Sequence, residues 1–77
     1  MTEILRQTSE TSVTVTLDAF PAGGASVNAA TTNAFLDHML TALGRYAGID
    51  LKVDATGDLP HHLIEDVAIT LGLALRD

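Results

Sequence analysis

Two stretches of strict alternation between apolar and polar residues constrain the fold more than any other feature of this sequence. In residues 12–19 the apolar side chains fall on one side and the polar side chains on the other, and residues 49–56 repeat the pattern. A period of two places successive side chains on opposite faces of a strand. Both stretches are therefore predicted to be strands with one face buried and the other in water.

Weaker signals predict two more strands. Residues 3–8 are expected to form a strand that reaches the next one through a turn at residues 7–10. The turn signal of residues 20–24 is followed by a weaker alternation at residues 25–29. We expect these first three strands to pair in meander order.

Two amphipathic helices are predicted around the last strand. Residues 31–33 offer N-cap side chains for a helix that runs to about Tyr46, with residues 47–48 ending it. His38 lies on the flank of its apolar stripe, which consists of Phe35, Leu36, Met39, Leu43 and Tyr46. After Gly57, Asp58 and Pro60 open a second helix, from about His61 to the C-terminal end.

The second helix has apolar residues on two sides. Its main stripe, expected to lie on the sheet, consists of Leu63, Ile64, Val67, Leu71, Ala74 and Leu75. Ile69 and Leu73 project from nearly the opposite side, the side of His62, so we expect a covered second face formed by a subunit contact. The element order is β-β-β-α-β-α, which predicts a two-layer α+β fold in one domain, residues 1–77.

Composition excludes several classes of function. The net charge is −6 and the four basic residues form no cluster, which disfavours binding to nucleic acid or to an anionic membrane. The absence of Cys excludes disulfides and thiolate metal sites and fits a cytoplasmic location. No membrane span or signal peptide is indicated. A chain of 77 residues buries a small core, so stabilisation by a partner chain or a metal is expected.

The stretch DLPHHLIED, residues 58–66, contains two of the three histidines. On a helix His61 sits over Glu65 and His62 over Asp66, and adjacent residues diverge by about 100°. One ion is therefore hard to chelate with both rings, so the stretch would hold two ions or use ligands from another segment or chain. His38 is the third histidine of the chain.

Metal binding and helix initiation are the two interpretations of this stretch. The positive end of the helix dipole favours neutral imidazole, and mixed imidazole and carboxylate ligands suit Mn, Fe, Zn or Ni. Alternatively, the histidines are exposed first-turn residues and the carboxylates suit the helix dipole. A nucleophilic triad and a phosphate-binding glycine loop are less favoured, because no Ser or Thr is placed near the histidines and residues 22–24 open no helix.

Four blocks of the sequence carry a family resemblance: RQTSET at residues 6–11, FLDHML at 35–40, GDL at 57–59, and HHLIEDV at 61–67 with Leu71-Gly72. Together they resemble imidazoleglycerol-phosphate dehydratase. The resemblance covers essentially the whole chain, but within the family it covers the N-terminal one of two similar halves.

The resemblance implies a fold, a cofactor and site residues. The fold would be that of a ribosomal protein S5 domain 2-like half-domain. The family dehydrates imidazole glycerol phosphate in histidine biosynthesis with Mn2+ held between subunits of a homo-oligomer. Family metal ligands fall on His38, His61, His62 and Glu65, with catalytic roles at Glu10, a proposed proton-transfer group, and at Glu65. Asp66 would support the site.

Some residues depart from the family pattern. Tyr46 stands where many relatives have another His, and Ile69 where the C-terminal half has a lysine. The chain has four basic residues, which are few for a site that must bind the phosphate group of a substrate. Two functions are therefore expected: a self-assembling, metal-binding dehydratase-type lyase, or an oligomeric metal-binding or ancestral-like half-domain without catalytic activity. A third hypothesis is a purely structural domain of the same fold, in which the HHxxE residues bind no metal and have no catalytic role.

Overall fold

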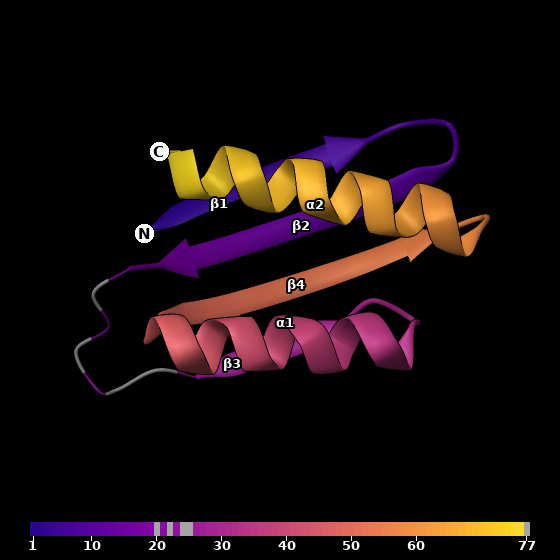
Figure 1. Cartoon of the computed structure of the whole chain (residues 1–77). Helices are drawn as coiled ribbons and strands as arrows, with labels where there is room; N and C mark the ends of the chain where they lie inside the picture. Colours follow the sequence, from indigo (N-terminus) through magenta and orange to yellow (C-terminus); the bar gives the residue numbers. More distant parts are fainter. Residues whose placement is uncertain (20, 22, 24–25, 77) are drawn as a thin grey trace.

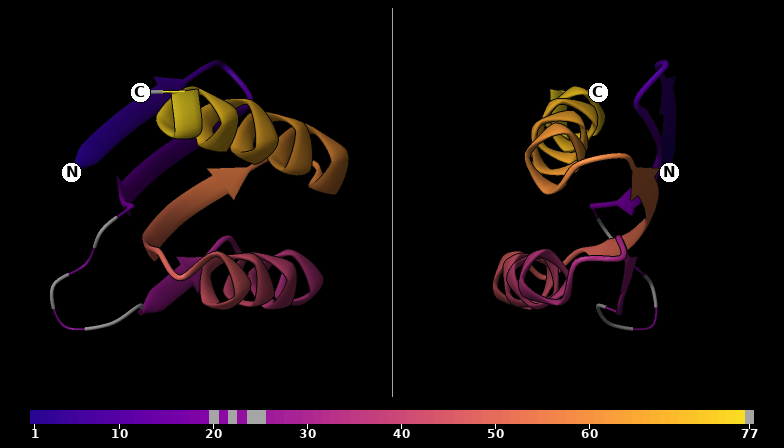
Figure 2. Two further views of the ribbon diagram at one scale, coloured as in Figure 1. Left: turned by 60° about the vertical axis from the view of Figure 1, so that its left-hand side comes forward. Right: turned by 90° about the vertical axis from the view of Figure 1, so that its right-hand side faces the viewer.

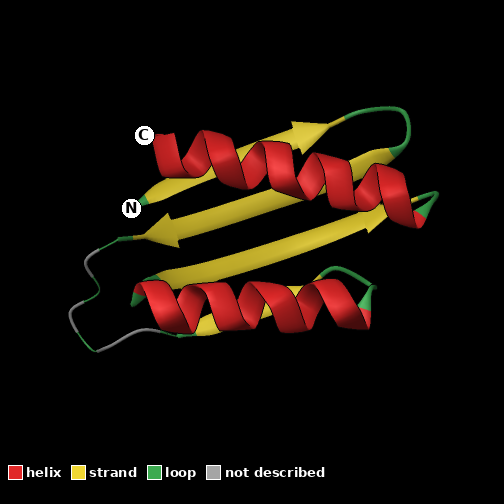
Figure 3. Ribbon diagram, viewed as in Figure 1, coloured by secondary structure: helices red, strands yellow, loops and turns green. Residues whose placement is uncertain are grey.

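Six elements follow one another in a computed structural model, which describes residues 1–19, 21, 23 and 26–76. They are β1 (Thr2–Gln7), β2 (Thr11–Asp18), β3 (Val27–Ala30), α1 (Ala34–Ala47), β4 (Asp50–Gly57) and α2 (Pro60–Arg76). This order confirms the predicted α+β arrangement β-β-β-α-β-α (Figure 3). Residues 20, 22 and 24 of the predicted turn, and residue 25 at the start of the third predicted strand, lie outside the described residues.

The strands form one mixed sheet in the order β1-β2-β4-β3 (Figure 1). The predicted meander is wrong at its third strand, because β3 pairs with β4, in parallel, and not with β2. The two strictly alternating strands, β2 and β4, pair antiparallel along their whole length in the middle of the sheet. The short β3 takes the edge beside β4, and α1 supplies the crossover that a parallel pair requires.

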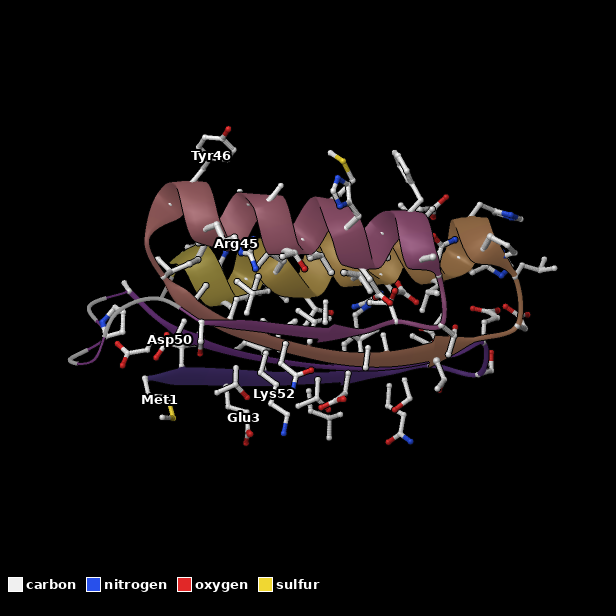
Figure 4. The ribbon with its side chains drawn as sticks, turned by 90° about the horizontal axis from the view of Figure 1, so that it is seen from below. Met1, Glu3, Arg45, Tyr46, Asp50 and Lys52 are labelled. Atoms are coloured by element: carbon white, nitrogen blue, oxygen red, sulfur yellow. The ribbon has the colours of Figure 1, made fainter. Side chains whose placement is uncertain are left out.

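Both helices cover the same face of the sheet (Figure 2). α2 packs over β1, β2 and β4, and α1 packs over β3. The core between the layers consists mainly of Val13, Val15, Leu17, Leu51, Val53 and Ala55 from the strands and Leu40, Leu63, Val67, Leu71 and Ala74 from the helices. The polar side chains of the alternating strands lie on the outer face, where Glu3 and Lys52 point away from the helices (Figure 4).

The ends of α1 match the predicted caps. The Asn33 side chain accepts a hydrogen bond from the Leu36 backbone N–H at 3.0 Å, and Gly48 ends the helix with a left-handed backbone, φ 70°. The apolar stripe of α1, however, is largely in solvent. Phe35 is 71% exposed and Tyr46 is 95% exposed, because α1 turns Leu40 and Gly44 toward the sheet.

The predicted stripe of α2 is confirmed in its centre and wrong at its edges. Leu63, Val67, Leu71 and Ala74 are buried, whereas Ile64 and Leu75 are 40% and 56% exposed. Asp66 and Thr70 take sheet-facing positions instead. On the other side of α2, Ile69 is exposed, as expected for a single copy, and Leu73 is half-buried. Within the described part of the chain, no helix is long and apolar enough to cross a membrane.

Candidate functional site

The start of α2 lies beside the β1–β2 turn at one end of the sheet. The Asp58 backbone N–H, just before α2, donates a hydrogen bond to the Glu10 carbonyl at 3.0 Å. The turn itself is held by Thr8, whose hydroxyl oxygen accepts the backbone N–H groups of Glu10 and Thr11, each at 3.1 Å. A hydroxyl that bonds its own turn in this way fixes the local backbone. Glu10 is therefore placed next to the helix start that contains the two histidines.

His62 pairs with Asp58, and not with Asp66 as its i, i+4 spacing suggested. The Nδ1 of His62 and the Oδ1 of Asp58 are 3.0 Å apart. This hydrogen bond is the main reason why the pKa of His62 is raised, and the nearby carboxylates of Glu10 and Glu65 raise it further. The same bond lowers the pKa of Asp58. The surrounding carboxylates therefore act on the pKa of this ring in the direction opposite to the one expected from the helix dipole.

The rings of His61 and His62 lie next to each other. Their centroids are 4.4 Å apart and their planes are tilted by 59°. His61 and Glu65 are exposed at the helix start, whereas His62 is half-buried. Two imidazoles and a carboxylate are thus accessible from outside the chain at this point.

Asp66 has a different environment, which the sequence pattern did not reveal. Its carboxylate is almost buried and accepts hydrogen bonds from the Thr11 hydroxyl and from the Arg6 Nε, the latter at 3.1 Å. The Thr11 bond is the largest cause of the lowered pKa of Asp66, followed by the bond from Arg6, while burial acts in the opposite direction. Both partners are more than fifty residues away in sequence, so no local spacing could predict these contacts.

His38 lies on the other helix. The preceding residue, Asp37, fixes the start of α1. Its carboxylate accepts hydrogen bonds from the Thr31 hydroxyl at 2.6 Å and from the Thr31 backbone N–H at 2.9 Å. The exposed His38 side chain lines a surface pocket of about 410 Å³ that is formed by α1 residues; the other lining residues are Thr41, Ala42, Arg45 and Tyr46. Tyr46 projects from α1 away from the sheet (Figure 4).

The predicted metal ligands do not form a complete site within one chain. Both helices begin at the same end of the sheet, but α1 and α2 cover opposite halves of it (Figure 1). Among residues 1–19, 21, 23 and 26–76, no three His, Asp or Glu side chains are close enough to hold one ion. The donor types nevertheless fit a divalent transition metal, since imidazole and carboxylate ligands suit Mn.

Comparisons with known proteins agree on one family. Residues 31–77 match the family model described as imidazoleglycerol-phosphate dehydratase. The chain is 52% identical over 77 residues to the imidazoleglycerol-phosphate dehydratase of Acidiphilium cryptum, with 96% of this chain and 38% of that protein covered. It is likewise 52% identical over 75 residues to that of Archaeoglobus fulgidus, with 97% and 39% covered. The chain thus spans about two fifths of the length of these relatives.

Proposed function

Because the chain belongs to the imidazoleglycerol-phosphate dehydratase family, we propose that it is a metal-binding, self-assembling half-domain of that enzyme type. Its lyase chemistry would be the dehydration of imidazole glycerol phosphate in histidine biosynthesis. One observation carries the proposal: exposed imidazole and carboxylate groups gather at the start of α2, beside Glu10, without completing a site among the described residues of one chain. Such a half-site requires a partner.

The proposed metal ligands are His38, His61, His62 and Glu65. Since His38 lies on α1 and the other three lie on α2, and no three such donors come together among the described residues, Mn2+ would be held between copies of the chain, by ligands from more than one copy. A bound Mn2+ would act as a Lewis acid toward the substrate imidazole. Asp58 orients the His62 ring by holding Nδ1, which leaves Nε2 as the ligand atom. Glu10 and Glu65 are the carboxylates placed to take or give a proton.

Self-association has support on the helix layer. Large apolar side chains that are 40% or more exposed lie on both helices: Phe35, Met39, Leu43, Tyr46, Ile64, Ile69 and Leu75. Large exposed apolar patches on soluble proteins mark interaction sites, which makes this layer a candidate interface. A second copy that covers these side chains would remove them from water and add to the small core of a 77-residue chain.

The alternative is an oligomeric metal-binding half-domain without catalytic activity. Its support is the distribution of positive charge. The sequence has four basic residues. Arg6 forms an ion pair with Asp66, and on the outer face of the sheet the Lys52 Nζ lies 3.9 Å from the Asp54 Oδ2. That leaves Arg45 and Arg76 to hold a substrate phosphate, for which enzymes usually arrange several converging cations.

Metal analysis tests the binding proposal. The protein is incubated with MnCl2, desalted, and its manganese is measured per chain, with His61→Ala and the exposed control Asp54→Ala in parallel. We expect wild type and Asp54→Ala to retain manganese in a fixed ratio and His61→Ala to retain less. A wild-type protein that retains none would overturn metal binding, and an unchanged ratio in His61→Ala would remove that residue from the ligands.

Complementation separates the two functions. The chain is expressed in a bacterial strain that lacks imidazoleglycerol-phosphate dehydratase, on medium without histidine. Growth that depends on both Glu10 and Glu65 supports the dehydratase. If the folded, manganese-loaded chain is present in the cells and they do not grow, the half-domain without catalysis is the better account.

A further inference from the structure

Three segments that are far apart in sequence meet at the carboxylate of Asp66. One carboxylate oxygen accepts the Arg6 Nε of β1 at 3.1 Å, and the other accepts the hydroxyl of Thr11, the first residue of β2. Thr11 is 4% exposed and Asp66 is 9% exposed, so the contact between them is shielded from water, whereas the Arg6 side chain is 37% exposed. The carboxylate thus joins both ends of the β1–β2 turn to the first turns of α2.

The turn joined in this way contains Glu10. Thr8 and Thr11 close the turn through a backbone bond of 2.9 Å and the Thr8 hydroxyl contacts. The Glu10 carbonyl, in turn, accepts the N–H of Asp58, whose carboxylate holds the His62 ring. Hydrogen bonds therefore link Asp66 through Thr11 and Thr8 to the Glu10 backbone, and the Glu10 backbone through Asp58 to His62.

Stability alone does not explain why residue 66 has a carboxylate and not an apolar side chain. Removing a charge from water is costly, and well-packed apolar groups of similar size often stabilise a fold as well as a buried ion pair does. β1 is already held to β2 along six paired residues, and α2 is already held to the sheet by its buried apolar residues. The β2–β4 ladder sets Thr11 opposite Gly57, and the Asp66 carboxylate adds a direct link from Arg6 and Thr11 to α2 itself.

We propose that Asp66 is a positioning residue, which fixes Glu10 and the β1–β2 turn against the helix start that contains His61, His62 and Glu65. The inference rests on the proposed function insofar as these groups form a metal-dependent site. The geometric part, that Asp66 sets the position of the turn, holds independently of any metal. Residues that orient metal ligands through hydrogen bonds commonly change metal affinity by one or two orders of magnitude.

The geometric part is tested in metal-free protein by amide hydrogen exchange. Asp66→Asn keeps the size of the side chain and removes its charge, and Asp54→Asn makes the same change in the exposed pair with Lys52. We expect the Asp58 and Thr11 amides to exchange about tenfold faster in Asp66→Asn, with the amides in the centre of the β2–β4 ladder unchanged. Asp54→Asn should match wild type at all of these amides.

Two outcomes of this experiment would overturn the proposal. If the Asp58 and Thr11 amides exchange as in wild type, Asp66 does not hold the turn. If all amides of Asp66→Asn exchange faster by the same factor, its role is general stabilisation. Neither result depends on whether the chain binds manganese.

The functional part is tested with a pair of variants at Thr11. Thr11→Ser keeps the hydroxyl that donates to Asp66, whereas Thr11→Val replaces it with a methyl group of similar size. With folded protein confirmed by circular dichroism, we expect the Mn2+ dissociation constant to rise about tenfold or more in Thr11→Val and to stay within about twofold of wild type in Thr11→Ser. Equal affinities in both variants would refute the link to the metal site. A wild type that binds no Mn2+ would instead refute the proposed function and leave the exchange experiment to decide on Asp66.

Discussion

At the scale of single residues, the pair of Asp58 and His62 makes the clearest prediction. The Asp58 carboxylate raises the pKa of His62 above its ordinary value of 6.5. In Asp58→Asn the pKa of His62 should fall, because the amide does not stabilise the charged ring as a carboxylate does. An NMR titration of the ring protons in metal-free protein measures this. The same pKa in both proteins would show that the Asp58 hydrogen bond is absent in solution.

The pair also predicts a pH dependence of stability. The folded pKa of His62 lies above its ordinary value of 6.5 and that of Asp58 below its ordinary value of 3.8, so the pair stabilises the fold most between these two pH values. This contribution is lost as the pH rises through the folded pKa of His62 or falls through that of Asp58. The difference in melting temperature between wild type and Asp58→Asn should therefore be larger at pH 5.5 than at pH 8.5. A difference that grows with pH would contradict this account.

The sequence predicted the candidate residues better than it predicted their contacts. The block at residues 61–66 and Glu10 do lie at one end of the sheet, and the resemblance identified them. Their site roles remain predictions. Helical spacing paired His62 with Asp66, but Asp66 turns inward to Arg6 and Thr11. Such contacts depend on how β1 and β2 lie beneath α2. The helical period of 3.6 residues shows which residues of one helix are neighbours, but not which residues of the sheet they meet.

At the scale of elements, the contact between α1 and β3 depends on Gly44. A Cβ atom at this position would lie 2.3 Å from the Val27 Cγ2, so the Val27 side chain must leave its rotamer or α1 must move away from the edge strand. Gly44→Ala should lower the free energy of unfolding by about 1–3 kcal/mol, as overpacking does in cores. Urea denaturation at a fixed protein concentration measures the loss.

Gly72 provides the matched control for this substitution. It lies inside α2, and an added Cβ there would meet nothing within 4 Å. Gly72→Ala should therefore leave the stability unchanged or raise it by up to about 1 kcal/mol, because Ala is the better helix former. If Gly44→Ala behaved like Gly72→Ala, the close approach of α1 to β3 would be wrong.

The types and limits of the elements followed from the sequence, but the place of β3 did not. Strict alternation identified β2 and β4, and the caps at Asn33 and Gly48 set the limits of α1. Alternation fixes which face of a strand is buried but not which strand is its neighbour. β4 displaced β3 from β2 because the two long alternating strands match along eight residue pairs, whereas β3 offers four residues.

At the scale of the whole molecule, the exposed apolar side chains of the helix layer predict an interface. Leu43 is 42% exposed on α1, and a charge there would have to be buried in any complex that covers this layer. Leu43→Glu should therefore shift the protein toward monomer, as measured by sedimentation velocity. Asn28→Glu, on the polar outer face of the edge strand, adds the same charge and should leave the assembly unchanged. Equal behaviour of the two variants would exclude the helix layer as the interface.

The central claim is that this chain is one part of a metal site that is completed by other copies. Light scattering coupled to size-exclusion chromatography, with manganese measured across the same peak, tests it most directly. We expect a homo-oligomer that contains manganese in a fixed ratio to chains, and a loss of mass when a chelator removes the metal. A metal-free monomer, with a mass that neither Mn2+ nor the chelator changes, would contradict the account.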